Sequence, residues 1–353
     1  MIKLFLLSIF MFTQGVLAVS NNVVFTQENQ LEQKQSVIND FWQQGDFSHF
    51  NGVKNKQIYY ASFSNTDHKK CLFIVSGRSE TYLKFKELAY DFFQQGFNIY
   101  LLDHRGQGLS ERLLSNKYKG YVADFDDYAD DLHTFVSKIT QTNCQNKSLP
   151  SYLLAHSMGG AIAVRYLQKY PNVLTAVVLS SPMIAFNDGG LPNWLSHTVI
   201  KTVNQLNQWF AKPSWYFFGQ GDFQLAEFAN NPLSHSEVRF GYFTDLYKNT
   251  AKIQLGGVTV HWLQQAIKTT QAIFADIDKI TTPTLVIQSG SDTIVDNNAQ
   301  NEFCAQLHKL QPQSCPSGKV VVIAGAKHEL FLESDRYRNI ALSKVLTWFN
   351  QHH

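Results

Sequence analysis

Three residues far apart in the sequence have the types that nucleophilic acyl chemistry requires. Ser157 lies in the stretch AHSMGG, Asp292 in QSGSD and His328 in GAKHE. A serine hydroxyl is a weak nucleophile at neutral pH, so it needs an imidazole base, and the imidazole needs a carboxylate that orients it. The three residues therefore predict a Ser-His-Asp catalytic triad.

The residues around Ser157 differ at one position from the G-x-S-x-G pattern of a nucleophile elbow, because Ala155 occupies the place of the first glycine. A methyl group is tolerable there if Ala155 has the negative φ of a strand end. Gly159 and Gly160 keep the helix side of the turn free of side chains. We therefore expect a strand-turn-helix elbow in which the Met158 N–H is one oxyanion donor.

Two neighbouring residues compete for roles in this site. Asp296 follows Asp292 by four residues and could orient the imidazole instead, but Asp292 directly follows a strand-end Gly-Ser and is the better candidate. His156 adjoins Ser157, and adjacent side chains on an elbow diverge, so we expect it to be packed or hydrogen-bonded. The His328-Glu-Leu sequence lacks the second histidine of a zincin helix, and no metal site is predicted.

The second oxyanion donor should come from a loop that follows an earlier strand. That loop has the sequence VSGRSETY, in which Gly77 allows close backbone approach and the Arg78 N–H is the candidate donor. Two interpretations of the Arg78 guanidinium are equally weighted. It contacts a phosphate or carboxylate of the substrate, or it pairs with Glu80.

The elements that must position these residues are apolar strands alternating with helical patterns, which indicate a parallel α/β sheet. The expected strands, in chain order, are 56–64, 70–77, 99–106, 151–157, 176–181, 282–290 and 319–325. The alternation stops from about Met183 to Val260, where helical pieces and turns predict an insertion. We expect core segments at 19–183 and 261–353 and a helical cap at 184–260. The order serine, aspartate, histidine is that of α/β hydrolases.

The N-terminal stretch MIKLFLLSIFMFTQGVLA has one lysine, a short apolar run and small residues near its end. It predicts a signal peptide over residues 1–18 and export to the periplasm or the exterior, since the run is too short to span a bilayer. A net charge of +2 from 30 basic and 28 acidic residues without long runs argues against a nucleic-acid partner.

Export would allow the four cysteines to form disulfides, with three possible pairings. Cys304 and Cys315 are close in sequence, and bridging them would close a short loop. Cys71 and Cys144 would then pair by default. Four free thiols remain the alternative if the chain is not exported.

Together, several stretches resemble bacterial lysophospholipases of the L-two type, within the monoacylglycerol-lipase-like α/β hydrolases. The likeness runs from about Phe41 to Phe349, and its main stretches are SGRSETYLKFKELAYDFFQQGFNIYLLDHRGQGLSER, FDDYADDL, LLAHSMGGAI, LSSPM, VDN and GAKHELFLESD. The usual His-Gly of the lipase branch is Ser76-Gly77 here, which favours the lysophospholipase branch over true monoglyceride lipases.

The resemblance implies an α/β-hydrolase fold with an eight-stranded, mostly parallel sheet and a cap inserted after the sixth strand. Ser157, Asp292 and His328 match the family's nucleophile, acid and base, and Arg78 falls in its oxyanion loop. It implies hydrolysis of one acyl ester of a lysophospholipid or monoacylglycerol without a cofactor, and it leaves peripheral membrane contact open.

The family's sheet order also places the strand from Cys71 beside the strand from Tyr152, so that Cys71 and Cys144 lie near the end of the sheet opposite the catalytic loops. That placement makes their disulfide plausible. Two other functions are kept as alternatives. One is acyltransferase or peptidase chemistry on the same triad, and the other is a non-catalytic binding protein on a hydrolase fold.

Overall fold

The structure is a computed structural model that describes residues 25–139, 144, 149–171, 173–187, 193–210 and 214–352. The predicted signal peptide, residues 1–18, lies outside the described residues and stays a prediction. Within the described part of the chain, no helix is both long enough and apolar enough to span a membrane.

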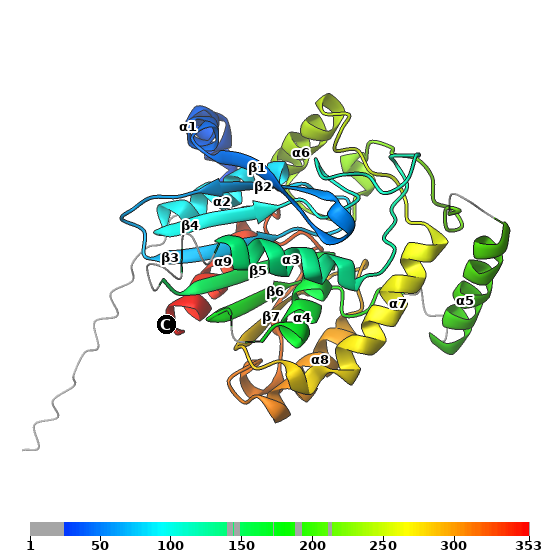
Figure 1. The fold of residues 1–353 in the computed structure, drawn as a ribbon. Coiled ribbons are helices and arrows are strands. Elements are labelled where there is room, and N and C mark those ends of the chain that lie inside the picture. Colours follow the sequence, from blue (N-terminus) through cyan, green and yellow to red (C-terminus); the bar gives the residue numbers. More distant parts are fainter. Residues whose placement is uncertain are drawn as a thin grey trace, which may run out of the picture.

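One sheet organises the described residues (Figure 1). Its strands, in chain order, are β1 (Asp46–Asn51), β2 (Gln57–Phe63), β3 (Lys70–Val75), β4 (Phe97–Leu102), β5 (Ser151–His156), β6 (Ala176–Ser180), β7 (Thr284–Ser289) and β8 (Val321–Ile323). Their spatial order is β1-β2-β4-β3-β5-β6-β7-β8. Strand β2 alone runs opposite in direction to the other strands of this sheet, so the expected eight-stranded, mostly parallel sheet is confirmed.

The central strands are buried on both faces because helices cover both. The helices are α1 (Leu31–Gln43), α2 (Lys86–Gln94), α3 (Asp126–Ile139), α4 (Met158–Lys169), α5 (Asn193–Phe210), α6 (Glu237–Asn249), α7 (Val260–Ala275), α8 (Asn297–Leu310) and α9 (Asp335–Asn350). In Figure 1, α3 and α4 lie in front of the sheet and α2 and α9 behind it.

Alternate residues of each strand enter two separate cores, as the pleat of a strand requires. In β5, Leu153 packs with side chains of α3, α4 and α8 on one face. The next residue, Leu154, packs with side chains of α1, α2 and α9 on the other face. The two cores hold the carboxyl ends of β3, β5 and β7 in fixed register, and the loops after these strands carry three of the predicted site residues.

The segment between β6 and β7 contains α5, α6 and α7. The first two belong to the stretch in which the strand-helix alternation was expected to stop, and α7 packs on α4 of the core. The exact division into core segments 19–183 and 261–353 and a cap at 184–260 stays a prediction.

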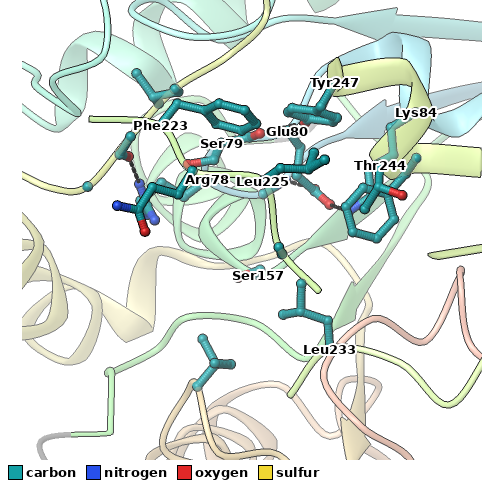
Figure 2. A pocket seen from close by; sticks show the side chains of 18 of the residues that line it. Arg78, Ser79, Glu80, Lys84, Ser157, Phe223, Leu225, Leu233, Thr244 and Tyr247 are labelled. Carbon is teal, nitrogen blue, oxygen red and sulfur yellow. Dashed lines mark hydrogen bonds and ion pairs between the residues drawn. The ribbon is translucent and has the colours of Figure 1, made fainter. Parts of the chain in front are cut away.

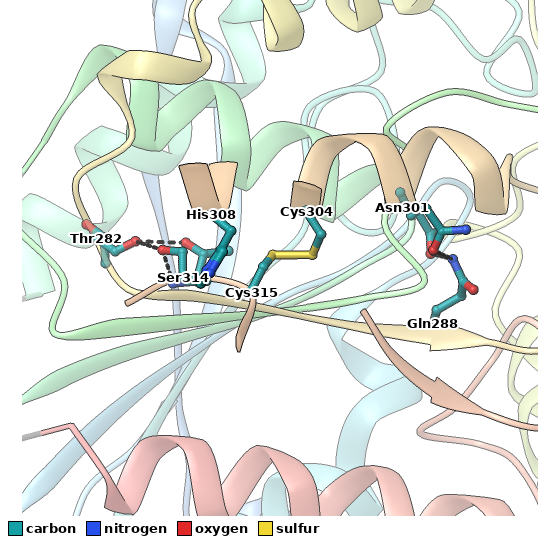
Figure 3. Close-up of a disulfide and its surroundings, with 9 residues drawn as sticks. Thr282, Gln288, Asn301, Cys304, His308, Ser314 and Cys315 are labelled. Atoms are coloured by element: carbon teal, nitrogen blue, oxygen red, sulfur yellow. Dashed lines mark hydrogen bonds between the residues drawn. A yellow bond between two sulfur atoms is a disulfide. The ribbon is translucent and has the colours of Figure 1, made fainter. Parts of the chain in front are cut away.

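Both predicted cysteine pairs are joined in the structure, and no described cysteine is free. Cys71 of β3 pairs with Ser151 at the start of the β3–β5 ladder. It forms a disulfide with Cys144, 73 residues further along the chain. Cys304 of α8 bonds to Cys315, 11 residues on, beside the side chains of His308 and Ser314 (Figure 3). The alternative of four free thiols is wrong for this structure.

Candidate active site

The backbone at Ser157 has the strained conformation of an elbow between β5 and α4. Its φ of 52° and ψ of −119° are rare for a residue with a side chain. Three backbone hydrogen bonds hold it there. The Ser157 N–H donates to the Ser180 carbonyl at 3.1 Å, and its carbonyl accepts from the N–H groups of Gly160 and Met183, each at 2.9 Å.

Small residues around the elbow have the packing reason that the sequence suggested. A Cβ on Gly159 would lie 2.5 Å from the carbonyl oxygens of Val75 and Ser76, and one on Gly160 would lie 2.5 Å from Pro182. Ala155, by contrast, is an ordinary strand residue paired with Val75 and Leu179. Glycine is therefore required after the serine, and the strand position before it accepts a methyl group.

The three predicted triad side chains lie in one hydrogen-bonded chain. The Ser157 Oγ is 2.9 Å from His328 Nε2, and His328 Nδ1 is 2.7 Å from Asp292 Oδ2. The Asp292 side chain is buried. Burial opposes its ionisation, but His328 and the N–H groups of Ile294 and Val295 hold its pKa below the ordinary value.

An ionised Asp292 fixes the proton of His328 on Nδ1, which leaves Nε2 free to accept the serine proton. Asp296, the competing carboxylate, has a structural role instead. It is the N-cap of α8 and accepts a hydrogen bond from the Asn298 N–H at 2.8 Å. The structure therefore brings Asp292 to the imidazole and leaves Asp296 at a helix end.

The loop after β3 lies directly against the elbow. A Cβ on Gly77 would lie 3.1 Å from Ser157 Cβ and 3.2 Å from His156 Nδ1, so glycine is needed for this approach. Among the described residues, the N–H groups of Arg78 and Met158 have no hydrogen-bond acceptor. Two free donors thus flank the serine, as an oxyanion hole requires.

A buried group of four charged side chains lies behind this loop and is called the Lys84 cluster here. Lys84 Nζ is 2.6 Å from Glu80 and 2.7 Å from Glu329, and His156 Nδ1 is 3.2 Å from Glu80. Glu80 Oε2 also accepts the Gly77 N–H, while His156 Nε2 is 3.3 Å from the His328 carbonyl. The cluster thus contacts both the loop after β3 and the backbone of His328.

The charges in the Lys84 cluster stabilise one another against burial. Burial alone lowers the pKa of His156, but the carboxylates of Glu80 and Glu329 outweigh it and raise the pKa to about 9. Burial also opposes ionisation of Glu80, yet Lys84 and His156 hold its pKa well below the ordinary value. The atoms of Glu80, His156 and Glu329 are close enough to ligate a metal, but Lys84 already supplies positive charge there.

The sequence did not reveal the Lys84 cluster. His156 is buried and hydrogen-bonded, as expected, but its partners come from segments 76 and 172 residues away. The expected alternative of an Arg78–Glu80 pair is wrong, because Glu80 pairs with Lys84 and His156. The one sequence signal was the i, i+4 spacing of Glu80 and Lys84, which is typical of an ion pair on a helix.

A cavity of about 760 Å³ opens above Ser157. Arg78 and Lys84 lie on opposite sides of Ser157 in the view of Figure 2. The apolar part of the cavity wall comes mainly from the segment between β6 and β7. The large apolar residues of the wall are Phe223, Leu225, Leu233, Phe243, Tyr247, Leu255 and Ile294. The arrangement can hold an acyl chain with its carbonyl near the serine.

Comparison with known proteins identifies the family of this chain and several of its relatives. Residues 66–335 match the family model described as serine aminopeptidase, S33. The chain is 35% identical over 318 residues to lysophospholipase L2 of Escherichia coli K12, covering 89% of this chain and 90% of that protein. It is 26% identical over 304 residues to the monoglyceride lipase homolog of monkeypox virus, covering 85% and 96%.

Among solved structures, a soluble variant of monoglyceride lipase from Saccharomyces cerevisiae superposes with a TM-score of 0.67 at 17% identity, covering 87% of this chain and 94% of that one. This likeness concerns the fold. Together with the family model and the sequence relatives, it means that the chain belongs to the serine aminopeptidase S33 family of α/β hydrolases and is a carboxylic ester hydrolase of the lysophospholipase and monoglyceride lipase type.

Proposed function

We propose that the protein hydrolyses the acyl ester of lysophospholipids or monoacylglycerols through Ser157, His328 and Asp292. The observation that carries the proposal is the hydrogen-bonded chain from Ser157 Oγ through His328 to Asp292, which opens into a cavity with an extensive apolar wall. The named activities of the E. coli and monkeypox relatives support both substrate classes.

The reaction proceeds in two acyl transfers. His328 Nε2 takes the hydroxyl proton as Ser157 Oγ attacks the acyl carbonyl carbon, and Asp292 stabilises the resulting imidazolium. The N–H groups of Arg78 and Met158 bind the oxyanion. His328 then gives the proton to the departing glycerol oxygen. Water activated by the same imidazole releases the fatty acid from the serine.

The experiment that tests the triad replaces the nucleophile. Ser157→Ala should lower kcat for a lysophospholipid by about 10⁴-fold or more while leaving the far-UV circular dichroism spectrum unchanged. Labelling with a fluorophosphonate should give one modified peptide, which contains Ser157. Ester hydrolysis that survives in the pure variant would overturn the triad.

Other acyl chemistry on the same serine is separated by a product panel. The purified enzyme is given a lysophospholipid, a monoacylglycerol, an aminoacyl-peptide ester and a lysophospholipid with excess glycerol. Free fatty acid from the first two substrates supports hydrolysis. Glycerol acylated by the lysophospholipid as the dominant product would assign an acyltransferase. Cleavage of the peptide bond, without hydrolysis of the lipid esters, would assign a peptidase.

Export is a further part of the proposal. The signal-like sequence at residues 1–18 and the two disulfides support it, because disulfides persist in oxidising compartments. Cell fractionation followed by mass spectrometry should find the protein outside the cytoplasm with an N-terminus near Val19. An intact N-terminus in the cytoplasmic fraction would contradict export.

Peripheral contact with a lipid surface also stays a prediction. Trp209 and Phe218, in the segment between β6 and β7, are 69% and 70% exposed, which supports such a contact. Co-sedimentation with vesicles of phosphatidylethanolamine and phosphatidylglycerol tests it. The double variant Trp209→Ser, Phe218→Ser should leave more protein in the supernatant, and equal partition of the two proteins would refute the contact.

A further inference from the structure

The guanidinium of Arg78 lies in the wall of the Ser157 cavity and is unusually short of partners. Its Nη1 donates to the Gly256 carbonyl at 3.1 Å, and Gly120 lies close enough that a Cβ there would be 3.6 Å from the same atom. Among the described residues, its Nε and Nη2 have no hydrogen-bond acceptor. Most of its donors are therefore available to a molecule in the cavity.

Arg78 is partly buried, and a comparison with the buried arginines of the protein shows which partner it lacks. Four of them each form ion pairs with two carboxylates, and these are Arg105, Arg165, Arg239 and Arg338. Arg78 has no carboxylate partner among the described residues. Withdrawing a charge from water without a counter-ion is unfavourable even when the burial is partial, so an anion bound in the cavity would supply the missing partner of Arg78.

The acidic side chains of the same cavity are already occupied. Glu80 and Glu329 hold Lys84, and Asp222 accepts hydrogen bonds from Asn116 and from the hydroxyl of Tyr216. None of the three is paired with Arg78. The Lys84 ammonium is neutralised, so Arg78 is the described cation of the cavity that can attract a negative group of the substrate.

We propose that the Arg78 guanidinium binds the phosphate of a lysophospholipid whose acyl ester lies at Ser157. This inference rests on the proposed function and narrows it. A planar guanidinium binds phosphate oxygens through two parallel hydrogen bonds, which an ammonium cannot do. The phosphate thus supplies the counter-ion that the protein lacks.

The two contacts that Arg78 would make fit the connectivity of such a lipid. Six covalent bonds separate the acyl carbonyl carbon from the phosphorus atom in a 1-acyl lysophospholipid. Six also separate the backbone nitrogen of an arginine from Cζ of its guanidinium. One residue can therefore hold the developing oxyanion with its N–H and the phosphate with its side chain. A monoacylglycerol, which has a hydroxyl at that place, leaves the guanidinium unpaired.

The test compares two substrates with the same acyl chain. 1-Myristoyl-lysophosphatidylethanolamine and 1-monomyristoylglycerol are hydrolysed in the same neutral detergent micelles by the wild type, Arg78→Gln and Arg78→Lys. We expect Arg78→Gln to lower the ratio of the two kcat/KM values at least tenfold, mainly through KM of the lysophospholipid. Arg78→Lys should retain part of the preference, and Arg336→Gln, which changes an exposed arginine, should retain the wild-type ratio.

An equal loss on both substrates would overturn the proposal, since Arg78 would then act only through its backbone or the loop fold. A second measurement does not depend on catalysis. Isothermal titration calorimetry of Ser157→Ala protein with sn-glycero-3-phosphoethanolamine should give binding that weakens at least tenfold when Arg78→Gln is added.

Two outcomes of the calorimetry are decisive. In the first, inorganic phosphate binds as tightly as the glycerophosphodiester and the substrate ratio does not depend on Arg78. That result would assign a site for free anions and overturn the headgroup role. Arg78-dependent binding of the glycerophosphodiester by an enzyme that hydrolyses neither lipid would support the phosphate site and refute the proposed function.

Discussion

Lys84 and Arg78 line the same cavity on either side of Ser157, and their surroundings differ in kind. Lys84 is held by two carboxylates and forms part of a buried cluster in which each charge has an opposite partner. Arg78 is partly buried, and its guanidinium bonds only to a backbone carbonyl. The charge of Lys84 is balanced by carboxylates of the folded protein, and the charge of Arg78 is not. The difference separates a side chain that holds the site together from one that is available to the substrate.

The largest predicted difference between Lys84 and Arg78 is in the free energy of unfolding. Lys84→Gln leaves Glu80 and Glu329 buried without their common cation, so the free energy of unfolding should fall by about 3 kcal/mol or more. Arg78→Gln leaves no unpaired carboxylate and should change it by less than about 1 kcal/mol. Urea denaturation at pH 7 measures both, with the exposed Lys248→Gln as the surface control. Equal losses for Lys84 and Arg78 would contradict the distinction.

A second prediction separates the two carboxylates of Lys84. Glu80 also accepts the Gly77 N–H and so fixes the loop after β3, which carries the proposed oxyanion donor, whereas Glu329 holds Lys84 without a bond to that loop. Displacement of a catalytic donor costs up to about 100-fold in rate. Glu80→Gln should therefore lower kcat at least tenfold more than Glu329→Gln, with little difference in KM between the variants. Similar kcat values would show that the bond to Gly77 is dispensable.

A third prediction concerns the pH dependence of stability and His156. Folding raises the pKa of His156 from 6.5 to about 9, so the folded chain holds this proton more tightly than the unfolded chain. The resulting stabilisation is complete below about pH 6.5 and is lost as the pH rises through about 9. Glu80, Glu329 and Lys84 face the imidazole and set this shift.

His156→Gln should remove that part of the pH dependence. Across pH 6 to 9 the wild type should lose on the order of 1 to 3 kcal/mol more stability than the variant, as shifts of this size imply. Urea midpoints at each pH give the measurement. Parallel curves for the two proteins would mean that His156 is neutral in the folded state and that the Lys84 cluster is less charged than described.

Local pattern and chain order were enough to predict much of this molecule. Ser157 could be recognised because its neighbours must be small, and Asp292 and His328 because each follows an apolar strand in the order of α/β hydrolases. Strand β1 was not predicted from the residues. It is an edge strand whose six residues include a single buried one, Phe50, so it lacks the alternation that marks a strand.

The Lys84 cluster and the unpaired guanidinium could not be found in this way. Glu80, His156 and Glu329 each stand beside a recognised motif, and only the fold brings their atoms together. Whether Arg78 pairs with Glu80 depends on whether Glu80 has another partner, and spacing along the chain does not determine that. The apolar wall of the cavity is also assembled only by the fold, since Phe223 and Phe243 line it while Trp209 and Trp215 of the same segment are exposed.

The positive φ of Ser157 has a consequence for anyone who modifies this protein. Three backbone hydrogen bonds force the chain through an unfavourable turn at the one side chain that the proposed reaction needs most. Selection for heat resistance alone would therefore favour glycine at this position, where it relieves about 1 to 3 kcal/mol of strain. A thermostability screen without an activity assay would tend to collect intact, durable and inert proteins.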